Sequence, residues 1–484
     1  MFEAVFQNID NIMRTDAGCS TVIDYVEQTS WILFLKYLDD YEKGQATAAL
    51  LTGESYKPIL DTEFQWSNWA APKLPTGGID YNSALTGPDL INFVDKELFP
   101  YFRQFRLSAD NARTLEYKIG EIFDEINNKL QSGYALRNVI DAVDGLSFLS
   151  NDEKYELSSL YEDKIKNMGN AGQNSGEYYT PRPLIKSIVE VIDPQIGETI
   201  YDPAVGSAGF LCAAYDHIRT SKELTATEYD QLQNHTLYGK EKKSLAYVIG
   251  LMNMILHGVE APNLVHTNTL NEIIVDIQER DKVDVVLANP PFGGSELQQI
   301  QQNFPIPSSE TAYMFLQHFI RVLKDGGRGG IVIKNTFLSN TDNASTALRK
   351  QLLEECNLYA VLDLPGGTFT GAGVKTVVLL FGKGKPTEKI WYYQLNLNRN
   401  LGKTNPLNEK DLAEFRELAP KQELCENSWI VDIADINTDT WDLTVNNPNR
   451  VEIVDSRTPA EIIAEIKQLD VQAAQALQAI EELL

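Results

Sequence analysis

Short apolar runs alternate with segments of helical periodicity between residues 199 and 381, and this alternation restricts the fold more than any other feature of the chain. The predicted strands are residues 199–202, 236–240, 263–266, 283–287 and 331–333. Strands that alternate with helices form a mainly parallel sheet with right-handed crossovers. Two later runs, residues 358–364 and 374–381, have no helix between them. The sequence therefore predicts an α/β fold with a mostly parallel sheet and an antiparallel last strand.

Two helices are predicted within this series, at residues 245–257 and 313–323. The glycine-rich residues 325–330 are expected to form the turn that ends the second helix. A third helix is expected from about residue 183, with Thr180 as its N-cap and prolines inside its first turn.

A chain of 484 residues is too long for a single hydrophobic core, so we expect several domains. The five predicted parts are a helical N-terminal domain at residues 1–166, a linker at 167–176, an α/β domain at 177–400, an irregular extension at 401–456 and an amphipathic C-terminal helix at 457–484.

The C-terminal helix has the clearest start signal in the chain. Thr458 and Glu461 have the spacing of a capping box, with Pro459 at the first helical position. Apolar residues then recur in steps of four and three, as in a coiled-coil seam, at Ile462, Ile466, Leu469, Ala473, Ala476, Ile480 and Leu483. The helix is expected either to dock on its own domain or to pack against a helix of another chain.

A stiff polar loop, Asn289-Pro290-Pro291-Phe292, follows the predicted strand at residues 283–287. Each proline fixes its own φ and pushes the preceding residue towards an extended conformation. Open α/β sheets bind ligands at the carboxyl ends of their strands, which is where this loop lies. The Asn289 side chain and the Pro290 carbonyl can accept both hydrogens of an amine, and Phe292 can stack on a planar base. The loop thus suits methylation of an exocyclic amine on a base that is flipped out of its duplex.

A turn at the end of the first predicted strand offers a second binding element. It begins at Asp202 and contains Gly206 and Gly209, which allow a ligand to approach the backbone. The Asp202 carboxylate would repel a pyrophosphate but suits an ammonium group. Glu241, at the end of the next strand, can accept hydrogen bonds from a ribose, and it lies further along the chain than the ~20 residues usual in dinucleotide folds. A ligand with adenosine, an amino-acid tail and no phosphate is S-adenosylmethionine.

The charge of the chain argues against binding of nucleic acid without help. The net charge is −26, whereas a protein that grips DNA alone normally has a basic face. We therefore expect another subunit to provide most of the contact. The four cysteines and five histidines do not have metal-site spacing, and neither a membrane span nor a signal peptide is predicted, so a reducing cytoplasm is expected.

Taken together, these motifs resemble the modification (M) subunit of type I restriction-modification systems, a family of adenine-N6 DNA methyltransferases with a Rossmann-like, S-adenosylmethionine-dependent catalytic domain. The resemblance covers nearly the whole chain and rests on residues 10–14, 24–30, 176–182, 202–211, 241, 289–292, 364–365, 369 and 374–376.

The resemblance implies a set of site residues. The cofactor would be bound by Glu177, Tyr178, Tyr179, Thr180, Pro181, Arg182, Asp202, Gly206, Ser207, Ala208, Gly209 and Glu241. The catalytic residues would be Asn289, Pro290, Pro291 and Phe292. Two positions depart from the family pattern: Val205 replaces a smaller residue or cysteine, and Asn268 replaces an aspartate, so Asn268 can form hydrogen bonds but carries no charge.

The resemblance also implies partners. A specificity (S) subunit would read the DNA sequence, a restriction (R) subunit would cleave, and two M chains would bind each S subunit. Two alternatives remain open: an amino-group methyltransferase acting on RNA or on protein glutamine, and a catalytically inactive assembly protein.

Overall fold

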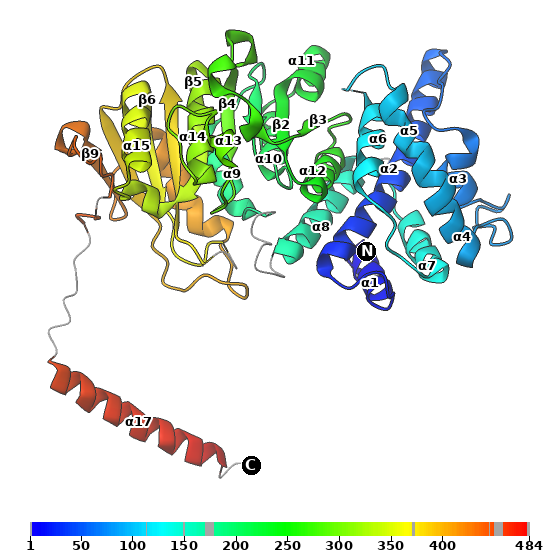
Figure 1. The fold of residues 1–484 in the computed structure, drawn as a ribbon. Helices are drawn as coiled ribbons and strands as arrows, with labels where there is room; N and C mark the ends of the chain where they lie inside the picture. The colour runs from blue at the N-terminus through cyan, green and yellow to red at the C-terminus, as the bar shows by residue number, and fades with distance from the viewer. Residues whose placement is uncertain are drawn as a thin grey trace. The chain divides into compact units, whose positions relative to one another are not determined.

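A mixed sheet is the centre of the fold in this computed structural model, which describes residues 2–112, 114–148, 151–169, 179–369, 373–444, 446–449 and 458–481. The strands of this sheet are β1 Ile200–Asp202, β2 Leu237–Glu241, β3 Asn263–His266, β4 Val283–Ala288, β5 Leu323–Lys334, β6 Cys356–Asp363, β7 Thr376–Lys383, β8 Lys389–Gln394 and β9 Ser428–Asp432. Their order is β3-β2-β1-β4-β5-β7-β6-β8-β9 (Figure 1). Strands β1 to β5 are parallel, and β7 is antiparallel to both β5 and β6. The predicted fold class is confirmed.

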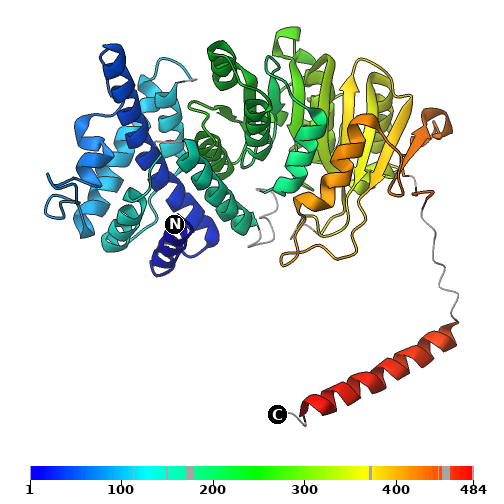
Figure 2. The same ribbon diagram turned by 180° about the vertical axis from the view of Figure 1, so that it is seen from behind.

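Helices cover both faces of the sheet. The helices from residue 182 to residue 418 are α9 Arg182–Ile192, α10 Gly209–Ser221, α11 Ala226–Gln231, α12 Ser244–Leu256, α13 Gln298–Gln301, α14 Thr311–Val322, α15 Asn343–Glu355 and α16 Ala413–Leu418. Helices α14 and α15 lie in front of the sheet in Figure 1, and α9 and α16 in the reverse view of Figure 2. Each face of the sheet has its own hydrophobic core, and β4 contributes side chains to both because side chains alternate along a strand. Val285 and Leu287 pack with α9, α10 and α12, whereas Val286 and Ala288 pack with α14.

The N-terminal part of the chain is helical, as predicted. Its helices are α1 Phe2–Arg14, α2 Val22–Thr52, α3 Trp66–Trp69, α4 Gly87–Phe93, α5 Phe99–Ser108, α6 Leu115–Glu125, α7 Gly133–Asp144 and α8 Asn151–Gly169. Helix α12 packs against α2, α6 and α8. Buried Lys118 of α6 donates from Nζ to the Leu264 carbonyl of β3 at 2.6 Å and pairs with Glu121 at 3.1 Å. Residues 1–445 thus form one compact unit, and α8 continues into the first residues of the predicted linker.

Two predictions for the later part of the chain are wrong. The glycine-rich residues 325–330 lie within strand β5, although its pairing with β4 skips residues 324–327 and resumes at Arg328. Glycine is needed there because a Cβ on Gly329 would lie 2.9 Å from the ring of Phe381 in β7. Residues 401–456 are not simply irregular, since they contain α16 and β9, and β9 pairs with β8. This late strand was missed because the segment around it lacks any regular apolar alternation.

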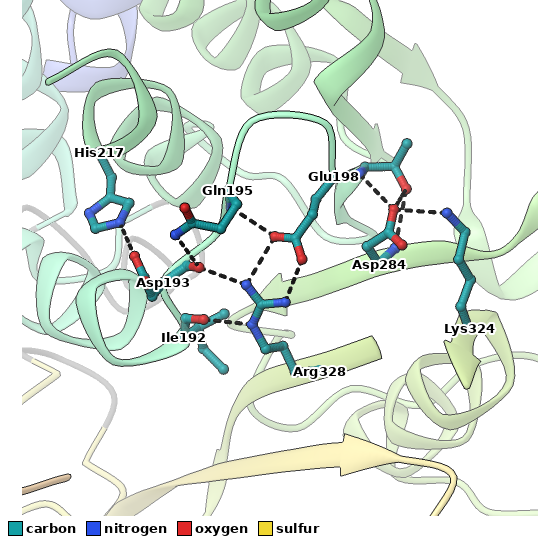
Figure 3. Close-up of polar contacts among 9 residues, drawn as sticks. Ile192, Asp193, Gln195, Glu198, His217, Asp284, Lys324 and Arg328 are labelled. Atoms are coloured by element: carbon teal, nitrogen blue, oxygen red, sulfur yellow. Dashed lines mark hydrogen bonds and ion pairs between the residues drawn. The ribbon is translucent and has the colours of Figure 1, made fainter. Parts of the chain in front are cut away.

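Arg328 of β5 fixes the C-terminal end of α9 (Figure 3). Its Nε donates to the Ile192 carbonyl and its Nη2 to the Asp193 carbonyl, both at 2.6 Å. These are carbonyls that a helix end leaves without an intrahelical partner. The same guanidinium forms a bidentate ion pair with Glu198, with N–O distances of 2.7 and 2.9 Å. Helix α9, which begins near the predicted catalytic loop, is therefore held in register with β5.

Residues 446–484 form a second unit, which contains helix α17 Pro459–Glu481. The Glu461 carboxylate accepts from the Thr458 amide at 2.6 Å and the Thr458 hydroxyl accepts from the Glu461 amide at 3.3 Å, so the predicted capping box is present. Ile462, Ile466 and Leu469 are exposed on this helix. Over the part of the chain that the structure describes, no helix has both the length and the apolar character that a membrane span requires.

Helix α14 contains a buried histidine that should make stability depend on pH. Burial, aided by the positive charge of Lys240, lowers the pKa of His318 to about 3. An unfolded histidine has an ordinary pKa near 6.5, so the unfolded state takes up the proton first. Protonation of His318 therefore does not lower the unfolding free energy above about pH 6.5. Below that pH the unfolding free energy decreases by about 1.4 kcal/mol per pH unit as the pH drops towards 3.

We expect His318→Leu to have a shallower decrease of unfolding free energy between pH 6.5 and 4.5 than the wild type. The difference in slope should correspond to about one bound proton, and denaturant unfolding at each pH measures it. His235→Gln is the control, because His235 is exposed. Parallel pH profiles for the wild type and His318→Leu would show that His318 is protonated equally in the two states.

Candidate active site

The loop Asn289-Pro290-Pro291-Phe292 follows β4 directly, at the carboxyl end of the parallel strands. Asn289 donates from Nδ2 to the Thr180 hydroxyl at 2.9 Å. The other end of the amide, Oδ1, is buried and has no hydrogen-bond partner. A buried acceptor without a partner is costly in a folded protein, and such groups are concentrated at functional sites. The loop therefore presents a free amide oxygen at the ligand edge of the sheet.

Phe292 meets a second aromatic residue from a distant loop. Its ring packs edge-to-face against Phe369, with 5.1 Å between ring centroids and an interplanar angle of 81°. Phe369 belongs to the connection between β6 and β7, and its side chain is buried. This contact fixes one edge of Phe292.

The turn between β1 and α10 is tightly folded. Gly206 has φ 53° and Ala208 has φ 60°, and Ala208 is the N-cap residue of α10. Glu241, the last residue of β2, accepts from the Gly206 amide at 2.8 Å through Oε2 and from the Lys243 amide at 2.8 Å through Oε1. The predicted ribose acceptor therefore also ties its strand to the glycine turn.

Two carboxyl groups lie at this turn, and one of them is fully buried. Asp202 is only 1% exposed; its Oδ1 accepts from the Ala204 amide at 2.9 Å, whereas Oδ2 has no partner. Burial, with a smaller effect from the charge of Glu241, raises the pKa of Asp202 well above its ordinary value. Burial also raises the pKa of Glu241, although its backbone donors oppose the shift. Both groups would gain from a positively charged or hydrogen-bonding ligand.

Helix α12 approaches the turn at Gly250, where a Cβ would lie 2.8 Å from the Gly206 carbonyl oxygen. Alanine normally stabilises a helix by about 1 kcal/mol relative to glycine. We expect Gly250→Ala to do the reverse and to lower the unfolding free energy by about 1–3 kcal/mol, because the backbone of the turn must move. Gly44→Ala, in α2, is the matched control, since a Cβ there would have no neighbour within 4 Å. Equal stabilisation by both variants, measured by denaturant unfolding, would contradict this reading.

One cavity brings three predicted residues together, Glu241, Asn289 and Pro291, whereas Asp202 and residues 206–209 are not part of its lining. Its lining consists of Pro203, Ala204, Glu241, Lys242, Lys243, Ala246, Thr267, Asn268, Thr269, Asn289, Pro291, Glu296, Thr311 and Phe315. Asn268 accepts from the Leu270 amide at 3.1 Å and donates to the Glu296 carboxylate at 3.3 Å. Glu296 also forms an ion pair with Lys242 at 2.7 Å. The cavity therefore extends from the end of β2 to the loop after β4.

Arg182 contacts the glycine turn and helix α8. Its Nη2 donates to the Ser207 hydroxyl at 3.1 Å, and its Nε lies 3.0 Å from Glu162 of α8. Burial alone would raise the pKa of Glu162, but Arg182 and His257 hold it below its ordinary value. Arg182 thus links the helical N-terminal part to the glycine turn.

The outcome for the remaining predicted residues is mixed. Tyr179, Pro181 and Arg182 line a second cavity, with Phe369, Lys403 and residues 406–409. Thr180 is not a helix cap, because Pro181 is the N-cap residue of α9 and the Thr180 hydroxyl accepts from Asn289 instead. Glu177 and Tyr178 lie outside the described residues.

Two acidic residues near the site were missed. Glu162 sits in a helix with no motif, and Glu296 follows a glycine pair that indicates only a loop. No local signal in the sequence marks either residue.

A parallel sheet with a glycine turn after β1, an acid at the end of β2 and Asn-Pro-Pro-Phe after β4 defines an amino-group methyltransferase of the open α/β class. Comparison with known families agrees. Residues 3–143 match the HsdM N-terminal domain, and residues 152–456 match N-6 DNA Methylase. The chain belongs to the family of type I restriction enzyme methylase subunits, with an adenine-N6 DNA methyltransferase domain, as predicted.

Its relatives include the EcoEI methylase subunit of a type I restriction enzyme from Escherichia coli, which is 34% identical over 96% of this chain and 93% of the relative. The EcoKI methylase subunit from Escherichia coli K12 is 29% identical over 68% of this chain and 66% of the relative. A crystal structure of a modification subunit of a putative type I restriction enzyme from Vibrio vulnificus is 33% identical, with a TM-score of 0.81, and covers 93% of this chain and 97% of its own. A chain from a study of complex assembly in a type I restriction-modification system is 36% identical, with a TM-score of 0.79 and coverage of 99% and 97%.

Proposed function

We propose that this chain uses S-adenosylmethionine as methyl donor and that the Asn289 loop holds the adenine amine that is methylated. The observation that carries the proposal is the free Oδ1 of Asn289, on a side chain that lines the same cavity as Glu241. An acceptor for the amine and an acceptor for a ribose thus face one space.

A cofactor that combines adenosine with an amino-acid tail would occupy both this cavity and the adjoining turn after Asp202. Glu241 would accept from the ribose hydroxyls, and Asp202 Oδ2 would gain the partner it lacks if an ammonium group lay against the turn. The turn at residues 206–209 would let the ligand approach the backbone. Residues 179–182 would support this turn. Bound S-adenosylmethionine would supply a methyl group on a positively charged sulfur.

The catalytic work of the chain would be positioning. Asn289 Oδ1 and the Pro290 carbonyl would accept the two amine hydrogens, so that the nitrogen lone pair leaves the plane of the ring. Pro291 keeps the loop rigid, and Phe292, braced by Phe369, would stack on the flipped base. A strong general base is not needed for this step.

Partners follow from the acidity of the chain and from its family. Because the chain has a net charge of −26, we propose that it contacts DNA only in a complex whose S subunit reads the DNA sequence. This complex would contain two M chains per S subunit, and the full restriction complex would also contain an R subunit. The complex would act in the cytoplasm.

Methyl transfer tests the proposal. Tritiated S-adenosylmethionine and DNA are incubated with this chain, with and without an S subunit, and N6-methyladenine is isolated. Incorporation that requires the S subunit is expected. Transfer to RNA or to protein glutamine by the chain alone would favour the alternative activity, and cofactor binding without transfer to any acceptor would favour an assembly role.

We further propose that α17 packs on a helix of the S subunit through the apolar residues between Ile462 and Leu469, which are exposed within their unit. Deletion of residues 458–484 should then abolish co-purification with the S subunit while the remaining chain still binds the cofactor. Undiminished co-purification would show that this helix is not the contact.

A further inference from the structure

Thr180 contacts the catalytic loop from a segment far away in the sequence. Its hydroxyl accepts a hydrogen bond from Asn289 Nδ2 at 2.9 Å, although 109 residues separate the two. Because Nδ2 is engaged, the amide oxygen faces the opposite way, where it is buried without a partner. The hydrogen bond to Thr180 thus leaves the acceptor of this amide free for a ligand.

The orientation of the Asn289 amide decides which of its two polar groups is left free for a ligand. A side-chain amide rotated by 180° has nearly the same shape, so only its hydrogen-bond partners distinguish the two orientations. If the Asn289 amide turned over, its NH₂ group would occupy the buried position without a partner. Orphaned buried N–H groups are rarer in native structures than under-satisfied carbonyl oxygens. In the structure Nδ2 pairs with Thr180, and Oδ1 is the group without a partner.

The segment that carries Thr180 is held at several points. Arg182, two residues on, contacts Ser207 of the glycine turn and Glu162 of α8. Arg328 holds the far end of α9. Thr180 contacts Asn289 but is not part of the lining of the cavity that Glu241 and Asn289 share.

We propose that Thr180 is a positioning residue for methyl transfer: its hydroxyl orients the Asn289 amide so that Oδ1 accepts from the target amine. The proposal rests on the proposed function of Asn289. It differs from the sequence-based expectation that Thr180 contacts the cofactor.

Two substitutions separate these roles. Thr180→Val preserves the shape of the side chain and removes the acceptor, whereas Thr180→Ser retains the hydroxyl. Ser187→Ala is the matched control, since it removes a hydroxyl from helix α9, which follows Thr180, and this hydroxyl donates to the Pro183 carbonyl of the same helix. Each variant is assayed as the full chain with an S subunit for kcat, for KM of S-adenosylmethionine and DNA, and for cofactor Kd by calorimetry.

We expect Thr180→Val to lower kcat by about 10- to 100-fold, as for a misplaced catalytic group, with cofactor Kd and KM changed by less than about twofold. Thr180→Ser should restore most of kcat, and Ser187→Ala should match the wild type. A raised cofactor Kd with unchanged kcat would overturn the proposal in favour of a cofactor contact. Loss of kcat in Thr180→Ser as large as in Thr180→Val would also overturn it, because the hydroxyl would then not be the active feature. A wild-type complex that binds cofactor but transfers no methyl group would instead refute the proposed function itself.

Discussion

Asn289→Ala is expected to reduce kcat for adenine methylation by at least about 10²- to 10³-fold while cofactor Kd stays within about twofold of the wild type. The substitution removes Oδ1, the free buried acceptor at the end of β4. It leaves Glu241 and the glycine turn, which would bind the cofactor, untouched. The loss should fall on kcat because the amide would act most strongly when the amine nitrogen leaves the plane of its ring.

Rapid single-turnover transfer measures the chemical step, and calorimetry measures binding. Asn289→Asp is an informative companion, since it keeps an acceptor oxygen but cannot donate to the Thr180 hydroxyl. Loss of cofactor binding in Asn289→Ala would contradict the role proposed for this residue, because it would place the side chain on the cofactor and not on the amine.

Asp202→Ala is expected to have the opposite profile, with cofactor binding weakened by about 2–5 kcal/mol, the usual cost of removing one partner of a buried charge pair. In the free protein, burial disfavours the charged carboxylate, as its raised pKa shows. An ammonium group at Oδ2 would reverse this preference, so binding should release protons at a pH below the pKa of the free carboxyl.

Asp202→Asn distinguishes charge from structure. The asparagine carbonyl can still accept from the Ala204 amide, so the turn is retained while the charge is lost. We expect calorimetry to show weaker cofactor binding for Asp202→Asn as well, without proton release at this position. Binding equal to the wild type in Asp202→Asn would mean that Asp202 serves only to shape the turn.

Much of the fold was predictable because the signals are local. The apolar runs at β1 to β4, the capping box of α17 and the two prolines after Asn289 each restrict a few adjacent residues. Prediction failed where glycine served packing and not a turn, at Gly329 against Phe381. It failed again at β9, whose pairing with β8 depends on the finished sheet.

The sequence by itself determined the family, the fold class and the residues proposed for chemistry, since Asn289, Glu241 and Asp202 stand at strand ends that local patterns locate. Only the tertiary structure decided how these groups are held. The Thr180–Asn289 and Glu241–Gly206 hydrogen bonds join segments 109 and 35 residues apart. Such contacts depend on the order of strands in the sheet and on the register of α9, and no short stretch of sequence contains either.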